Sequence, residues 1–165
     1  MTTATQPLAP QPFAALDDCH RKMLQQLHEL QRMALHMESA GLSEADRKLA
    51  AEIEVFFSST SRAHHALEEQ QVFAPLLANG PDALTAVVRS LQQDHGFIEE
   101  NWTELGPQLR AIAEGNDWFE AAEFQHNVAL FLALVRGHIA LEESLIYPES
   151  QAQWADVVAR RLSWE

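Results

Sequence analysis

Two histidine–glutamate pairs with the same spacing recur in the chain, and together they could bind metal ions. His64 and Glu68 lie four residues apart in "HHALEEQQVFAP", and His138 and Glu142 repeat this spacing in "HIALEESLIYP". Residues four apart lie on one face of a helix. Each pair would therefore place an imidazole nitrogen beside a carboxylate oxygen, which are donors that iron, manganese and zinc accept.

Two further histidines lie on apolar helical faces. His95 is at helical spacing from Leu91 and Ile98, and His20 lies on a similar face of an earlier helix. Such a face points into the protein, where a polar ring without a partner is costly. Three of the other four histidines fall off these faces and are expected on the surface: His28, His36 and His126.

The spacing of the four inward histidines indicates a duplicated helical hairpin. His95 follows His20 by 75 residues, and His138 follows His64 by 74. With turns near residues 42, 80 and 116, antiparallel helices would place all four at one height, to within about 1.5 Å of helical rise. The alignment matches His64 to His138 and puts His65 opposite an isoleucine.

This layer favours a metal site over its simpler alternatives. A single inward histidine is more often a hydrogen-bonded core residue, and a single histidine–glutamate pair is more often a surface contact. Two bare carboxylates among four imidazoles would repel each other, and a pair of cations removes that conflict. The sequence thus predicts a buried dimetal site with six ligands: His20, His64, Glu68, His95, His138 and Glu142.

Four neighbouring residues have undecided roles. Glu69 and Glu143 could accept a hydrogen bond from the ring N–H of a ligand, or they could simply be solvated. Glu99, one turn after His95, could be an extra ligand, a hydrogen-bond partner of one, or a bystander. His65 is expected in a supporting or solvent-facing role. No residue is assigned a catalytic role.

Composition narrows the class of protein. The chain has 165 residues, of which 47% are hydrophobic, and a formal net charge of −13. That charge argues against nucleic acid or an anionic membrane as a partner. One cysteine excludes an internal disulfide and fits a reducing cytoplasm. The first residues do not resemble a signal peptide, and no apolar run is long enough to span a membrane.

Helical periodicity dominates the chain, and strand signals are weak. Four long helices are expected: residues 13–38, a second from Ser43 to residues 75–80, a third from Pro81 and a fourth from Asp117 to Pro148. The third helix is expected to kink or end at Gly106–Pro107. Capping boxes are expected at Ser43 with Asp46 and at Asp117 with Glu120. The segment "QLRAIAEG" is expected to form a separate turn.

The predicted fold is all-α, an antiparallel up-down-up-down four-helix bundle with a short C-terminal helix. Residues 1–12 would form a flexible tail, residues 13–148 the bundle, and residues 149–165 a helix packed on the bundle or extending from it.

The paired motifs, with a single histidine in "DDCHRKML" and another in "LQQDHGFIEE", resemble the hemerythrin-like family of HHE cation-binding domains. The resemblance covers about residues 13–148. It implies a non-haem centre of two iron ions with an oxygen-derived bridge, with His20, His64, His95 and His138 as terminal ligands. Glu68 and Glu142 would be the bridging carboxylates. Oxygen-carrying members have a second histidine where this chain has Glu99.

The leading hypothesis is a cytoplasmic metal-binding protein whose di-iron centre binds or senses dioxygen, nitric oxide or iron itself. The alternative is a di-iron enzyme that reduces peroxide, nitric oxide or oxygen in stress defence or iron-centre repair, with Glu99 as a proton shuttle. A third option is a helical interaction module that docks a partner through "QWADVVARRLSW". Zinc, manganese or nickel could replace iron in a recombinant sample. The oligomeric state is left open, with a homodimer as one option.

Overall fold

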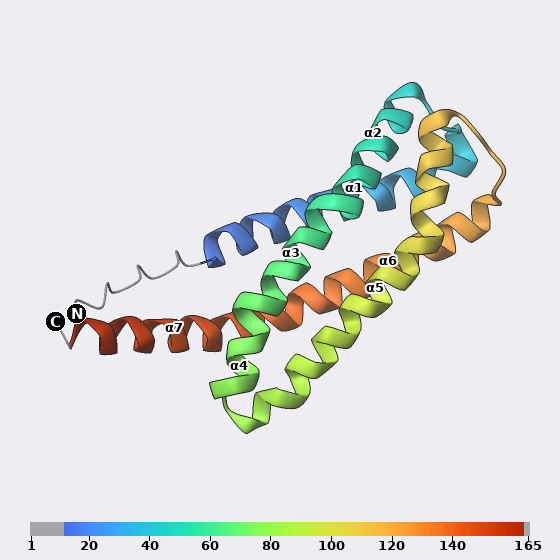
Figure 1. Ribbon diagram of the computed structural model, residues 1–165. Helices are drawn as coiled ribbons and strands as arrows, with labels where there is room; N and C mark the ends of the chain where they lie inside the picture. Colours follow the sequence, from blue (N-terminus) through green and yellow to red (C-terminus); the bar gives the residue numbers. More distant parts are fainter. Residues whose placement is uncertain (1–11, 164–165) are drawn as a thin grey trace.

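The computed structural model describes residues 12–163, which form an all-α bundle of four antiparallel helical stretches (Figure 1). The first stretch is α1 (Phe13–Ala40) and the third is α5 (Asp82–Glu114). The second and fourth are each divided by π-helical turns, named η1 to η3. The second stretch comprises α2 (Glu44–Val55), η1 (Phe56–Thr60), α3 (Ser61–Glu68), η2 (Glu69–Phe73) and α4 (Ala74–Asn79). The fourth stretch comprises α6 (Ala121–Leu141), η3 (Glu142–Ile146) and α7 (Tyr147–Leu162).

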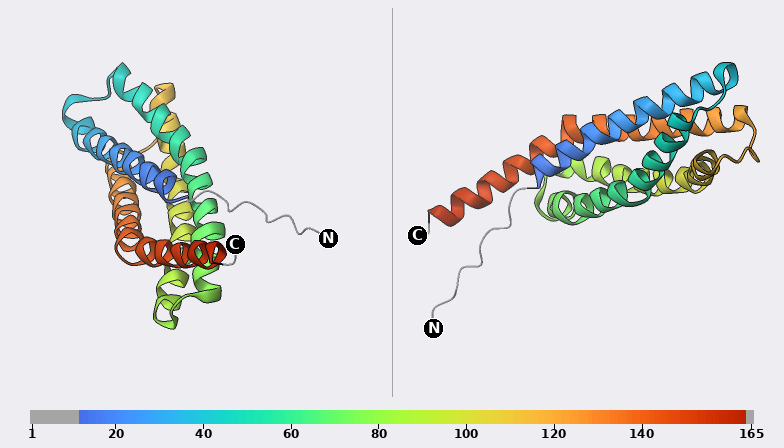
Figure 2. Two further views of the ribbon diagram at one scale, coloured as in Figure 1. Left: turned by 90° about the vertical axis from the view of Figure 1, so that its left-hand side faces the viewer. Right: turned by 90° about the horizontal axis from the view of Figure 1, so that it is seen from above.

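The four stretches pack in the cyclic order expected of an up-down-up-down bundle. α1 contacts α2, α3 and α6, whereas α5 contacts α2, α4 and α6. The left view of Figure 2 shows α1 and α5 at opposite corners, and the right view shows α7 running on from α6 beyond the bundle. The predicted fold class is therefore confirmed. The predicted N-terminal tail lies outside the described residues, apart from residue 12.

Local sequence signals explain where the second stretch begins. The Ser43 hydroxyl accepts a hydrogen bond from the backbone N–H of Asp46, and the Asp46 carboxylate accepts one from the N–H of Ser43. This capping box satisfies two backbone donors that a helix start leaves free. Gly41 has a φ of 68°, a left-handed conformation that glycine adopts without a steric penalty, so the chain can turn between α1 and α2.

Two predicted helix ends were wrong. α5 continues through Pro107, since the buried side chains of Leu105 and Leu109 anchor it on both sides. The fourth stretch also continues past Pro148, which lies in the first turn of α7. There the backbone N–H of Tyr147 bonds to the carbonyl of Glu142, five residues back. Such a turn interrupts the i→i−4 ladder, and we attribute the tolerance of a proline to this interruption.

The expected capping box at the start of the fourth helix was also wrong. Glu120 itself is the N-cap of α6, and no side chain caps that end. In the C-terminal segment, α7 extends from the bundle as a direct continuation of α6 and η3. Trp154 of α7 is half-buried and packs on the core beside Phe13. Trp164 lies outside the described residues.

The hydrophobic core consists of two clusters with a polar layer between them. One cluster includes Met23, Ile98 and Val135, and the other includes Leu16 and Leu91. Along α1 and α5, His20 and His95 fall between members of the two clusters. The layer is therefore closed by apolar side chains in both directions along the bundle axis.

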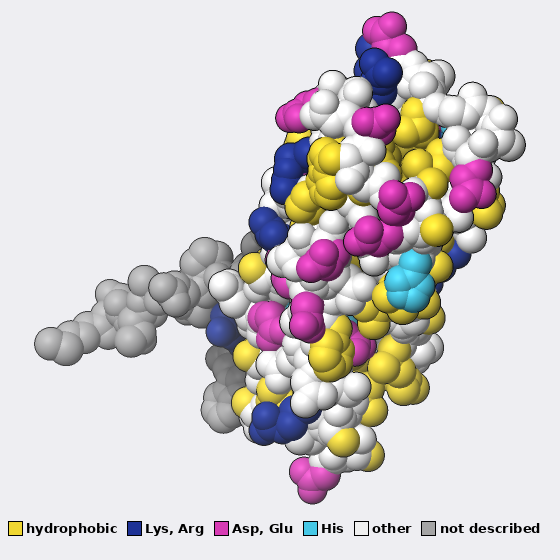
Figure 3. Space-filling view, turned by 90° about the vertical axis from the view of Figure 1, so that its right-hand side faces the viewer, with side chains coloured by type: hydrophobic (Ala, Val, Ile, Leu, Met, Phe, Trp, Pro, Cys, Tyr) yellow, Lys and Arg dark blue, Asp and Glu magenta, His cyan; other side chains and the backbone are white. Residues whose placement is uncertain are grey.

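The surface and the helix lengths bear on the class of partner. In Figure 3, acidic side chains are spread over the visible face and basic ones are fewer, in keeping with the net charge of −13. Such a surface repels nucleic acid. Among residues 12–163, no helix is both long enough and apolar enough to cross a membrane.

The capping box at the start of α2 gives a test of the fold. Ser43→Ala removes the hydroxyl that accepts the Asp46 N–H, so we expect the free energy of unfolding to fall by about 1 kcal/mol. Urea titration followed by circular dichroism measures this. Ser39→Ala is the control, because the exposed Ser39 hydroxyl only donates to the carbonyl of His36. Equal losses in both variants would show that the box contributes nothing specific.

Candidate metal centre

The polar layer brings all four inward histidines together, each from a different helical stretch. The His20 and His64 ring centroids are 4.7 Å apart, as are those of His95 and His138. All four side chains are buried. The sequence prediction that these rings share one height agrees with this arrangement.

Glu68 lies between the two histidine pairs and faces both. Its Oε1 is 2.9 Å from Nε2 of His64 and 3.5 Å from Nε2 of His20. Its Oε2 is 3.3 Å from Nε2 of His95. One carboxylate thus presents each of its oxygens to a different imidazole pair.

Glu142 occupies the equivalent place in the second half of the chain. Its Oε1 is 2.9 Å from Nε2 of His138, and its Oε2 is 3.2 Å from Nε2 of His20. Both carboxylates are fully buried, with relative exposures of 0%. The potential ligand atoms form two overlapping groups, within each of which all atoms lie within 4.8 Å of one another. These groups are His20, His64, Glu68 and Glu142, and His65, Glu68, His95 and His138.

Several of these buried atoms have no hydrogen-bond partner. They are Nε2 of His64, Oε2 of Glu68 and both carboxylate oxygens of Glu142. Buried polar atoms of folded proteins are normally satisfied, so such a cluster needs an explanation. Metal ions bound to these atoms would satisfy them, because the potential ligand atoms of each group lie within 4.8 Å of one another. The residues present therefore fit a buried metal centre.

The electrostatics of the metal-free layer show how strongly it attracts positive charge. Burial alone would lower the pKa of His20, but contacts with Glu142 and Glu68 raise it to about 10. His95 shows the same balance, and its pKa is also raised. Burial would raise the pKa of Glu68, yet its contacts with the His20, His64 and His95 rings lower it well below the usual range. In the metal-free chain, protons on the histidines supply positive charge that metal cations would otherwise supply, so metal binding should release protons.

Three carboxylates outside the layer bond the far ring nitrogens of the histidines. Nδ1 of His20 is 3.0 Å from Glu143, and Nδ1 of His95 is 2.8 Å from Glu69. Such contacts orient a ring and direct its other nitrogen toward a metal. Of the two options for Glu69 and Glu143, the structure favours the hydrogen-bond partner. The third carboxylate, Asp94, is 3.5 Å from Nδ1 of His138 and was missed, although it directly precedes His95 in the sequence.

His65 lies closer to the layer than the sequence repeat suggested. Its side chain is buried, its ring stacks on that of His95 at 4.1 Å, and the His138 ring meets it edge-on at 5.7 Å. Burial and the neighbouring His95 lower the pKa of His65 well below its usual value, which leaves a neutral imidazole with a free lone pair. A solvent-facing role for His65 is wrong, and the ring is placed to be an additional ligand.

Glu99 is paired with a surface arginine and not with the buried layer. Both of its carboxylate oxygens accept hydrogen bonds from Nε of Arg62, at 3.1 and 3.0 Å, and its side chain is 42% exposed. It belongs to neither of the two ligand groups. A carboxylate held by a surface guanidinium cannot also reach the buried layer, so the extra-ligand role considered for Glu99 does not fit the structure.

Tyr147 is the residue of the layer that the sequence reasoning passed over. Its hydroxyl donates a hydrogen bond to Oε1 of Glu68 and lies 3.1 Å from Nε2 of His20. Its ring stacks on the His20 ring at 5.2 Å. Burial, together with the negative charges of Glu68 and Glu142, raises its pKa, so the phenol is protonated in the metal-free chain. The duplicated motif could have indicated Tyr147, because Tyr147 follows His138 by nine residues, as Phe73 follows His64.

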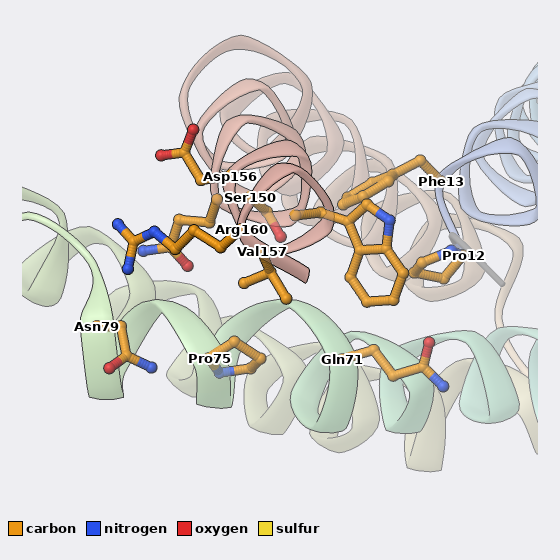
Figure 4. Close-up of a pocket in the computed structure, with 11 residues that line it drawn as sticks. Pro12, Phe13, Gln71, Pro75, Asn79, Ser150, Asp156, Val157 and Arg160 are labelled. Atoms are coloured by element: carbon orange, nitrogen blue, oxygen red, sulfur yellow. The ribbon is translucent and has the colours of Figure 1, made fainter. Parts of the chain in front are cut away.

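A separate groove lies away from these donors. It has a volume of about 780 Å3 and runs between α7 and the segment formed by η2 and α4, where Gln71, Pro75 and Asn79 face Val157 and Arg160 (Figure 4). Its lining includes none of the buried histidines or glutamates. The groove is therefore not part of the candidate metal centre.

Comparison with known proteins agrees with the chemistry of the layer. The family model described as the hemerythrin HHE cation binding domain matches residues 11–150. The chain is also similar to an uncharacterized protein of Haemophilus influenzae, with 27% identity over 159 residues that cover 92% of this chain and 90% of that protein. No solved structure matches the chain significantly.

The metal content of two variants should distinguish the buried Glu68 from the surface Glu99. Glu68→Gln keeps the shape of the side chain but removes the negative charge of the carboxylate whose two oxygens face the two histidine pairs. We expect this variant to lose most of its bound metal in elemental analysis after loading with iron(II). Glu99→Gln is the matched control and should keep the content of the unmodified protein. Equal metal content in the two variants would contradict the assignment of the site.

Proposed function

The chain belongs to the hemerythrin HHE cation-binding domain family, and from this premise we propose that it carries a di-iron centre that binds or senses a small ligand. The buried histidines and glutamates are donors suited to metal binding. The proposal takes iron as the metal, two ions as the stoichiometry, and dioxygen, nitric oxide or iron itself as the ligand.

The observation that carries the proposal is the two-sided placement of Glu68 and Glu142. In each carboxylate, one oxygen faces the pair formed by His20 and His64, and the other oxygen faces the pair formed by His95 and His138. The distances from these oxygens to the nearest imidazole nitrogens are 2.9–3.5 Å. A carboxylate that only balanced one protonated histidine would not need this arrangement. Two carboxylates that both face two imidazole pairs match the bridging groups of a dimetal site in a bundle core.

The donor sets of the two metal positions follow from the same distances. His20 and His64 would hold one ion with Oε1 of Glu68 and Oε2 of Glu142. His95 and His138 would hold the other with the remaining carboxylate oxygens, and the His65 ring lies beside them. Bound iron would supply a redox centre and a Lewis acid. The protein itself would orient the donors through Glu69, Glu143 and Asp94.

The surroundings of the layer favour a small ligand. Apolar clusters close it in both directions along the bundle axis. On one side, the Phe57 ring packs against Trp102 at 5.4 Å and against Phe131 at 5.0 Å. A diatomic molecule fits such surroundings better than an organic substrate does, because an organic molecule would have to displace packed side chains.

The enzymatic alternative draws on a different observation. Reduction of peroxide, nitric oxide or oxygen consumes protons as well as electrons. Glu99 does not support this route, since it is paired with Arg62 at the surface. Glu143 and Glu69 offer another, because each bonds a buried histidine while 48% and 35% of their side-chain surfaces, respectively, face solvent. The same centre could therefore take up protons from solvent.

The stoichiometry of iron is the first test. We expect the full-length protein, loaded anaerobically with iron(II) and desalted, to retain about two iron ions per chain. His64→Ala combined with His138→Ala removes one imidazole from each position and should abolish retention. The matched control combines His28→Ala with His126→Ala, since both of these histidines are exposed. Circular dichroism confirms folding, and a double variant that retains two ions would refute the proposed ligands.

The response to small ligands separates binding from turnover. We expect the reduced protein, mixed anaerobically with dioxygen or nitric oxide in a stopped-flow instrument, to form a spectral adduct that disappears when the gas is removed. Binding without consumption supports a carrier or sensor. Many turnovers of peroxide or nitric oxide with an added reductant would instead establish the enzyme and contradict the binding function.

A further inference from the structure

The polar layer contains two sets of residues that are related by the internal repeat, so the positions at which the two sets differ can be identified. The repeat pairs His20 with His95, His64 with His138 and Glu68 with Glu142. The outer hydrogen bonds also match, because Glu143 bonds His20 as Glu69 bonds His95. A side chain that breaks this correspondence within the layer therefore distinguishes one metal position from the other.

One such difference is a single hydroxyl group. Phe73 and Tyr147 occupy equivalent positions, each five residues after the buried glutamate of its half and next to a π-helical turn. The Phe73 ring stacks on His95 at 5.5 Å, and the Tyr147 ring stacks on His20 at 5.2 Å. The two aromatic rings thus serve the same packing role, and only Tyr147 adds an oxygen atom.

That oxygen lies among the atoms of one ligand group. It is 3.1 Å from Nε2 of His20 and hydrogen-bonded to Oε1 of Glu68. For comparison, Nε2 of His20 is 3.2 Å from Oε2 of Glu142. Ligands at right angles around an ion with metal–donor bonds of about 2.1 Å are separated by about 3.0 Å. The phenol oxygen is therefore at the same spacing as the carboxylate oxygen that would bind the same ion.

We propose that Tyr147 is a ligand of the metal ion held by His20 and His64, through its phenol oxygen. The inference rests on the proposed dimetal centre and adds a donor to one of its two positions. The hydroxyl proton, which Tyr147 donates to Glu68 in the metal-free chain, is released to solvent when the oxygen binds the ion. Tyr147 is 3% exposed, so water competes poorly for its place.

The two positions then differ in chemistry. The position of His20 and His64 gains an anionic oxygen, which favours iron(III) over iron(II). The position of His95 and His138 has no such oxygen, because Phe73 stands there, but it has the buried ring of His65 beside it. One ion is surrounded by more oxygen and the other by more nitrogen, which gives the two ions different reduction potentials.

The composition of the chain makes the test direct, because Tyr147 is its one tyrosine. The full-length protein is loaded with iron(II), oxidised in air and examined by visible absorption and resonance Raman spectroscopy. We expect a phenolate-to-iron(III) charge-transfer band and tyrosinate ring vibrations enhanced on excitation in that band. Any such signal comes from Tyr147, so the unmodified protein alone decides the question.

Variants confirm the origin of the signal. Tyr147→Phe reproduces the side chain of the other half, so it should keep its fold and its bound iron but lose the band and the ring vibrations. Glu99→Gln is the matched control and should keep both. A protein that holds two iron ions without a tyrosinate signal would overturn this inference and leave the di-iron proposal standing. A protein that retains no iron would overturn both.

Discussion

The central physical constraint on this molecule is the burial of two carboxylates in the core of a helical bundle. Glu68 and Glu142 are fully shielded from water, and each is surrounded by imidazole rings rather than by permanently charged partners. Isolated anions are very costly in such surroundings, so positive charge must enter the layer. Protonated histidines can supply it in the metal-free chain, at the expense of unsatisfied ligand atoms. Metal cations would satisfy the charge and the lone pairs together.

A π-helical turn lies beside each of the two buried carboxylates. η2 begins directly after Glu68, and η3 begins at Glu142. A π-helical turn shifts the side chains that follow it, because it adds a residue relative to an α-helical turn. Phe73 is the last residue of η2 and Tyr147 is the first residue after η3, and each places an aromatic ring against a histidine from another stretch. Local irregularity in the two stretches that carry the buried glutamates thus completes the packing around the layer.

The sequence predicted the parts of the site that depend on regular periodicity. His20, His95 and His138 lie in unbroken α-helices, so the constant helical rise places them at one height. His64 lies beyond η1, and its match to His138 in the repeat supports its place in the same layer. The position of Tyr147 could not be derived in this way, since the π-helical turn before it breaks that period. The roles of Glu99 and His65 depend on which neighbour each side chain meets on another helix, and helical spacing leaves that undetermined.

An internal repeat makes two equivalent metal positions the simplest expectation, and the side chains beside the ligands depart from that symmetry. His65 stands where the other half has Ile139, and Asp94 stands where it has Cys19. Neither exchange disturbs the bundle, because Cys19 packs against the apolar core while Asp94 bonds His138. Glu68 and Glu142 each face both histidine pairs. In the proposed di-iron centre, neighbours such as His65 and Asp94 would make the two metal positions chemically different while the helices keep the same arrangement.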